Sequence, residues 1–93
     1  MAAVPFNGDA TTAQTAARAA LLAEPRTKVV LEHPGYLRAE STSRLFRFVD
    51  DVEIVIDSTN RVYRFRSASR LGKGDMGVNR SRMTRIATRL GAP

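Results

Sequence analysis

The sequence predicts one small α+β domain over residues 1–93, with an ordered core of about residues 9–90. We expect an N-terminal helix, a four-stranded antiparallel meander and a C-terminal helix, with both helices on one face of the sheet. Three observations predict this class: an alanine-rich segment of helical period, four successive runs of strand character, and a second helical period near the end. A chain of 93 residues without cysteine holds one core and no disulfide.

The first helix is expected from Asp9 to Glu24, because Thr11 and Gln14 have the spacing of a capping box and Pro25 would end the helix. Small side chains share one face of this segment and predict close packing on a sheet: Ala13, Ala16, Ala17, Ala20 and Leu21.

Four short runs then have strand character, namely TKVVLE, YLRAES, RLFRFVDDVEIVID and RVYRFR, separated by HPG, STS and STN. A two-residue loop at Ser58–Thr59 would place Glu53 opposite Arg64 and Asp51 opposite Arg66. A four-residue loop would keep the same faces and a three-residue loop would invert them, so the sequence leaves the loop length open.

The last helix is expected over NRSRMTRIATRL, residues 79–90, with Asn79 as its cap and Gly91 after its end. Just before it, GKGDMG at residues 72–77 matches the dinucleotide-binding pattern G-x-G-x-x-G. That pattern requires a parallel β-α-β unit and an acidic residue about 20 positions downstream, and neither is present here. We therefore interpret the match as coincidental.

Positive charge is concentrated in the last third of the chain. Residues 61–93 contain nine Lys/Arg against the single acid Asp75, within a net charge of +6 for the whole chain. Such a block favours anionic partners, although it is also typical of a solvated basic face.

The run FRFVDDVEIVID, followed by VYRFRSASRLGKGDMGVNRSRM, resembles the signature of a bacterial and plastid family catalogued as domain of unknown function 1499. The resemblance covers about Pro5 to Leu90, lacks an upstream cysteine-bearing segment that members often carry, and has Gly74 where members generally have serine. It implies exported or membrane-attached relatives in many cases and no established activity. The matching positions are Phe48, Asp50, Asp51, Arg66, Ser67, Ala68, Ser69, Arg70, Gly72, Asp75, Gly77, Asn79 and Arg82.

A glycine-rich turn between a strand and a helix can direct backbone N–H groups at an anion. The candidate ligand-binding residues are Arg66, Ser67, Ser69, Arg70, Gly72, Asp75, Gly77, Asn79, Arg80 and Arg82. The competing interpretation is structural: the glycines permit tight turns and the serines bond to nearby backbone.

No catalytic residue, metal ligand or cofactor is assigned from the sequence. The acids Asp50, Asp51, Glu53 and Asp57 are better explained by charge pairing than by a metal. The only histidine, His33, precedes Pro34–Gly35 and is expected in a loop.

Asp50 falls in the middle of the core-facing stripe of the long third strand, among Phe46, Phe48, Val52, Ile54 and Ile56. A buried carboxylate requires a partner. We expect Asp50 to lie opposite Ser67 and to accept hydrogen bonds from Arg70 or from backbone N–H groups of the Ser67–Gly72 turn. A bulge at Asp50–Asp51 that turns the carboxylate to solvent is the alternative.

Two functions fit these features. The first is a non-enzymatic binding or accessory module whose RSASR-x-G-x-x-D-x-G-x-N loop and basic C-terminal helix engage an anionic small ligand, a lipid headgroup or an acidic protein surface. The second is a nucleic-acid-binding protein that uses Arg80, Arg82, Arg85 and Arg89. No apolar run approaches the roughly 18 residues that span a bilayer and no signal peptide is evident, so we expect a soluble chain of unassigned compartment.

Overall fold

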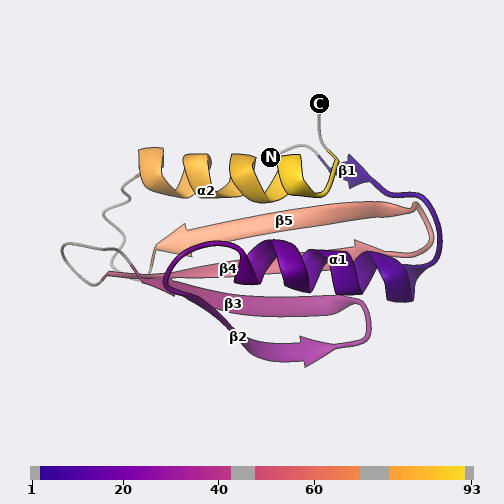
Figure 1. The fold of residues 1–93 in the computed structure, drawn as a ribbon, viewed down its shortest axis with the longest axis horizontal. Helices are drawn as coiled ribbons and strands as arrows, with labels where there is room; N and C mark the ends of the chain where they lie inside the picture. Colours follow the sequence, from indigo (N-terminus) through magenta and orange to yellow (C-terminus); the bar gives the residue numbers. More distant parts are fainter. Residues whose placement is uncertain (1–2, 43–47, 70–75, 92–93) are drawn as a thin grey trace.

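The computed structural model describes residues 3–42, 48–69 and 76–91. Along the chain the elements are β1 (Val4–Pro5), α1 (Ala10–Leu22), β2 (Thr27–His33), β3 (Tyr36–Thr42), β4 (Val49–Asp57), β5 (Val62–Ser69) and α2 (Met76–Arg89) (Figure 1). The α+β class and the antiparallel sheet are confirmed. Within the described residues the sheet has five strands rather than the expected four, in the order β1-β5-β4-β3-β2.

The additional strand, β1, lies outside the predicted core range. Val4 and Pro5 pair with Tyr63 and Val62 of β5, and the Phe6 N–H donates to the Arg61 carbonyl at 3.0 Å. Val4 is 5% exposed, so the core begins before residue 9. A strand of two residues is too short to show the alternation by which strands are recognised in a sequence.

Helix α1 begins after Asp9, whose carboxylate accepts the Thr12 N–H at 2.7 Å. Asp9 is therefore the N-cap, and the expected capping box of Thr11 and Gln14 is wrong. The Gln14 side chain instead reaches the turn between β2 and β3.

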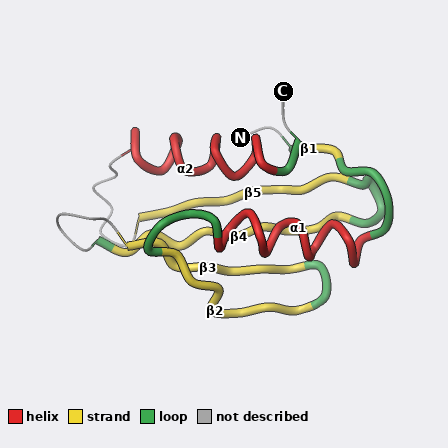
Figure 2. The backbone as a smooth tube through the Cα atoms, viewed as in Figure 1, coloured by secondary structure: helices red, strands yellow, loops and turns green. Residues whose placement is uncertain are grey.

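Both helices pack on the same face of the sheet, because their buried residues belong to one core with the inward-facing residues of the strands. Figure 2 shows α1 in front of the strands and α2 alongside β5. Helix α1 packs on β2, β3 and β4, and α2 packs on β5. The small side chains of Ala13, Ala17 and Ala20 let α1 approach the sheet closely, as the sequence indicated. Ala16 is exposed, so its predicted place on this face is wrong. The core consists of Val4, Ala13, Ala17, Ala20, Leu21, Leu37, Ala39, Val52, Ile54, Ile56, Tyr63, Met83, Ile86 and Ala87. The other sheet face carries no helix among the described residues.

The β4–β5 connection has four residues, since Asp57 pairs with Val62 and Arg61 takes a positive φ of 54°. The faces expected from the two-residue loop are kept, but the pairing is shifted by two positions: Glu53 lies opposite Arg66 rather than Arg64, and Asp51 lies opposite Ala68. Asp57 stabilises this longer turn by accepting the backbone N–H groups of Thr59 and Asn60, each at 3.1 Å.

Strand β4 starts at Val49, whereas the sequence predicted a strand from residue 44; residues 43–47, including Phe46, lie outside the described part. Phe48 precedes β4 and is 38% exposed, so its predicted place in the core stripe is wrong. From Asp50 onward the expected alternation holds, because Asp50, Val52, Ile54 and Ile56 are all buried.

Candidate functional site

The start of β4, the end of β5 and the start of α2 lie at the same end of the sheet (Figure 1). We call this end, defined by Ser41, Asp50, Ser67 and Arg82, the signature end. It gathers residues from four elements because β3, β4 and β5 are antiparallel neighbours and α2 packs on β5.

A buried ion pair occupies the signature end. Arg82 Nη1 of α2 donates to Asp50 Oδ2 of β4 at 3.0 Å, and the two residues are 5% and 6% exposed. The expected partner was Arg70 or the turn after Ser67; Arg70 lies outside the described residues. Asp50 lies opposite Ser69, not Ser67, and pairs with both neighbouring strands without a register shift. The alternative of a bulge that exposes Asp50 is therefore wrong.

Two serine side chains lie on the same helix-covered face as this ion pair. Ser41 lies directly opposite Asp50 on β3, is 1% exposed, and its hydroxyl lies 2.6 Å from the Thr27 hydroxyl. Ser67 lies opposite Val52, which places its side chain on the helix-covered face. An ion pair in such surroundings fixes α2 on the sheet, because leaving either charge buried alone is costly.

A second ion-pair cluster joins α2 to the end of α1. Glu24 is 3% exposed, and its carboxylate accepts Arg85 Nη2 at 2.7 Å and Arg85 Nε at 3.0 Å. Arg89 Nη1 donates to the other carboxylate oxygen. Burial by itself would raise the pKa of Glu24, but the hydrogen bonds and charges of Arg85 and Arg89 outweigh it and lower that pKa. Glu24 is thus held as a carboxylate.

Three of the four arginines that were expected to face phosphates therefore make intramolecular ion pairs: Arg82 with Asp50, and Arg85 and Arg89 with Glu24. Arg80 is exposed at the N-terminal half of α2 and forms no ion pair within the described residues. The role of Glu24 was not predicted from the sequence, in which Glu24 marks only the expected end of the first helix. An acid directly before Pro25 in a chain with a basic C-terminal third was the available signal.

The remaining predicted site residues are not all brought together. Arg66 is exposed and lies opposite Glu53 on the uncovered face of the sheet, away from Ser67 and Arg82. Ser69 is the last residue of β5. Gly77 and Asn79 lie inside α2, which starts at Met76, so the expected turn at Gly77 and cap at Asn79 are wrong. Arg70, Gly72 and Asp75 lie outside the described residues.

Comparison with known proteins identifies the family. A family model described as "Protein of unknown function (DUF1499)" matches residues 1–90. The chain belongs to this family. No curated protein and no solved structure matches it significantly.

Within this family member, the signature residues divide between the two sheet faces. Asp50, Ser67 and Arg82 belong to the helix-covered face, whereas Asp51 and Arg66 lie on the uncovered one. Alternation along β4 and β5 requires this division, because neighbouring residues of a strand point to opposite faces. A single site formed by both Arg66 and Arg82 is therefore incompatible with the sheet.

Acidic and histidine side chains do not assemble into a metal site: no group of three or more potential ligands occurs in residues 3–42, 48–69 and 76–91. His33 is exposed as the last residue of β2 rather than lying in a loop. It lies at the sheet end opposite the signature end (Figure 1). No described helix is long and apolar enough to span a bilayer.

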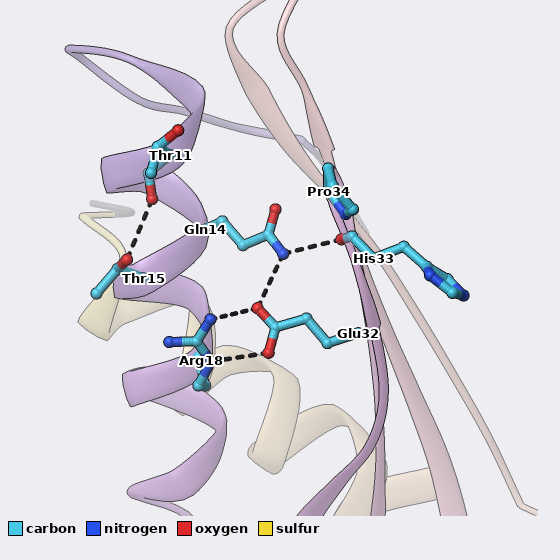
Figure 3. Close-up of a pocket in the computed structure, with 7 residues that line it drawn as sticks. All are labelled: Thr11, Gln14, Thr15, Arg18, Glu32, His33 and Pro34. Atoms are coloured by element: carbon cyan, nitrogen blue, oxygen red, sulfur yellow. Dashed lines mark hydrogen bonds and ion pairs between the residues drawn. The ribbon is translucent and has the colours of Figure 1, made fainter.

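A pocket of about 310 Å³ lies between α1 and the end of β2 (Figure 3). Its polar groups already bond to one another. Gln14 Nε2 donates to Glu32 Oε2 at 2.9 Å and to the His33 carbonyl at 2.8 Å, while Gln14 Oε1 accepts the Gly35 N–H at 2.6 Å. Hydrogen bonds from Arg18 and Gln14 lower the pKa of Glu32 to about 2. This network clamps the β2–β3 turn to α1.

Proposed function

We propose that this protein is a non-enzymatic binding or accessory module whose signature segment and basic helix α2 engage an anionic ligand or an acidic partner. The observation that supports the proposal most directly is the arrangement around Glu24. The Glu24 side chain is 1% exposed, while the Arg85 and Arg89 side chains that bind it are 49% and 39% exposed. The carboxylate lies behind the guanidinium groups, so an approaching anion meets the positive groups first.

The charge balance of α2 favours the same function. The helix contains four arginines and no acid, and its described ion-pair partners are the two carboxylates of Asp50 and Glu24. Two positive charges are left over. Because Asp50 and Glu24 also fix the helix on the sheet, Arg85 and Arg89 hold their positive charges in a defined geometry on one side of α2, and less conformational entropy is lost when an anion binds there. Arg80 adds a further exposed positive charge nearer the start of the helix.

The proposal assigns no catalytic residue, metal or cofactor. Nucleic acid is the less favoured ligand, since the burial of Arg82 leaves only Arg80, Arg85 and Arg89 of the helix to reach phosphates. Nonspecific phosphate binding would moreover be lost steeply with salt.

Calorimetric titration with a set of anionic probes and a neutral control, at low and physiological salt, tests the proposal. The probes are inorganic phosphate, vesicles with and without phosphatidylglycerol, polyglutamate, and duplex and single-stranded nucleic acid. We expect binding to at least one of the first three, and nucleic-acid binding that lacks sequence preference and disappears at physiological salt. Sequence-selective nucleic-acid binding at nanomolar concentration and physiological salt would instead favour the nucleic-acid function.

Matched variants separate a specific surface from net charge. Arg80→Gln with Arg89→Gln removes two positive charges from α2. The ion pair between Arg85 and Glu24 is kept, so Glu24 is not left buried without a partner. Arg61→Gln with Arg64→Gln removes two positive charges from the β4–β5 hairpin, one in its turn and one near the start of β5. The proposal requires a loss of about tenfold in affinity for the first pair and little change for the second. Equal losses for both pairs would contradict it.

A further inference from the structure

The face of the sheet that no described helix covers has balanced charge, unlike the rest of the molecule. The residues that alternate with the core positions of β2 to β5 contribute four basic and four acidic side chains. They are Lys28, Arg38, Arg64 and Arg66 together with Glu40, Asp51, Glu53 and Asp57. In a chain of net charge +6, this balance makes the face a poor site for a polyanion and suits a partner of mixed charge.

A row of alternating charge crosses the centre of this open face. Arg38 of β3 lies opposite Glu53 of β4, and Glu53 lies opposite Arg66 of β5. The Tyr36 hydroxyl donates to Glu53 Oε2 at 2.8 Å. The hydrogen bond to Glu53 raises the pKa of Tyr36, and the nearby charges of Arg38 and Arg66 oppose that increase. These side chains therefore share one electrostatic environment.

The two arginines of the row retain unused hydrogen-bonding capacity. Neither Arg38 nor Arg66 donates a side-chain hydrogen bond to a described residue, and Arg38 Nε is buried without a partner. Other charges of the face are paired locally, as in Arg64 with Asp57 at 3.2 Å. Guanidinium groups in this situation can exchange bound water for the carboxylates of a partner protein, with which they form strong hydrogen bonds.

Apolar side chains border the row. Leu31 lies opposite Arg38 and is 38% exposed, and Val55 lies opposite Tyr36 and is 40% exposed. Tyrosine and arginine with nearby aliphatic side chains are the composition that protein interfaces favour. The charge pattern of this face is complementary to that of a second copy of the same face, because Arg38 and Glu53 carry opposite charges at paired positions of β3 and β4.

We propose that two copies of this chain associate through their open sheet faces as a two-fold symmetric dimer, in which Arg38 of each copy faces Glu53 of the other. A two-fold axis parallel to the strands, midway between β3 and β4, places β3 of each copy over β4 of the other. Each residue keeps its height along the strand direction, so residues that pair within one sheet also meet across the interface. It places Arg38 over the partner's Glu53 and Tyr36 over the partner's Val55. The axis also lies between the two central strands of the four that form the face, which maximises the overlap.

One contact in this arrangement is unfavourable: Glu40 would approach the partner's Asp51, since these residues are cross-strand neighbours. Stacked sheets cross at about 30°, which separates residues far from the axis centre while the central row stays in contact. Glu40 also lies 4.0 Å from Lys28, which offsets its charge. The interface uses the face opposite α2, so it is independent of the proposed anion-binding surface.

Sedimentation equilibrium from micromolar to millimolar protein tests the dimer. The wild type should show a monomer–dimer equilibrium. Arg38→Glu and Glu53→Arg should each weaken association by at least about tenfold. In a dimer of either variant with itself, both of the contacts between residues 38 and 53 join side chains of like charge.

Mixing the two charge variants provides the complementary arm of this experiment. An equimolar mixture should associate again, because in the mixed dimer the two substituted side chains face each other with opposite charges. The native Arg38 of one variant then also faces the native Glu53 of the other. Arg80→Glu on α2 is the matched charge reversal and should leave association unchanged.

Chemical cross-linking tests the same contact with the charges intact. The chain lacks cysteine, so Tyr36→Cys and Val55→Cys each introduce the only thiol. A short bismaleimide should join the two variants in a mixture more efficiently than it joins either variant to itself. A wild type that stays monomeric at millimolar concentration would overturn the proposal. So would charge variants that fold, as judged by circular dichroism, but do not associate when mixed, or that dimerise as well alone as the wild type does.

Discussion

Arg82 and Asp50, 32 positions apart in the chain, form an ion pair of 3.0 Å with almost no solvent access. The pair joins α2 to the second residue of β4. Besides the apolar contacts of Met83, Ile86 and Ala87, it determines where the helix rests on the sheet.

Removing one partner of this pair should be strongly destabilising. We expect Asp50→Ala to lower the free energy of unfolding by about 3–5 kcal/mol, because it leaves the Arg82 guanidinium buried without its carboxylate. The urea midpoint at unchanged slope measures the loss. In contrast, Asp50→Leu combined with Arg82→Met should recover most of it, since no charge is then buried. A loss within about 0.5 kcal/mol for Asp50→Ala would show that the pair does not anchor the helix.

The stability contributed by Glu24 should depend on pH. The pKa of Glu24 is lowered in the folded protein from its usual value of 4.5, so the contribution is complete above about pH 4.5 and is lost as the pH falls through the folded pKa. Glu24→Gln removes the charge at every pH. The difference between wild type and variant in urea midpoint should therefore be largest at neutral pH and should shrink on acidification below about pH 4.5. A difference that stays constant down to about pH 2 would contradict the ion pairing.

The Gln14 side chain should hold the β2–β3 turn. Gln14→Ala removes three hydrogen bonds and leaves the Gly35 N–H without its acceptor, for an expected loss of about 1–3 kcal/mol. Amide exchange at Gly35 should accelerate at the same time. Thr15→Ala, on the same exposed helix side, is the control and should change stability by no more than about 0.5 kcal/mol. Equal effects of both substitutions would count against the clamp.

The hydroxyl of Tyr63 should couple α1 to β5. It donates to the Ala13 carbonyl at 2.8 Å inside the core, with ring contacts to Phe6 at 5.2 Å between centroids. Tyr63→Phe keeps the ring and removes the bond, and should cost about 1 kcal/mol in urea unfolding. A midpoint equal to that of the wild type would mean that the ring alone makes the contact.

Local periodicity by itself determined the α+β class, the two helices and the faces of the strands. Asp50 could be assigned to the buried face because it shares parity with Val52 and Ile54, and parity depends only on neighbours two positions apart. The basic C-terminal third was equally visible, since charge can be counted without coordinates.

Only the tertiary structure decided which groups meet. The shift of the β4–β5 register by two positions results from a four-residue loop with Arg61 at positive φ, and either loop length satisfies the same alternation. The partners of Asp50 and Glu24 come from α2, 32 and at least 61 positions away, through the docking of a helix whose rotation is fixed by Met83, Ile86 and Ala87. Such pairings depend on long-range packing, and sequence patterns of period two or 3.6 carry no information about which distant side chain a packed helix brings to a buried charge.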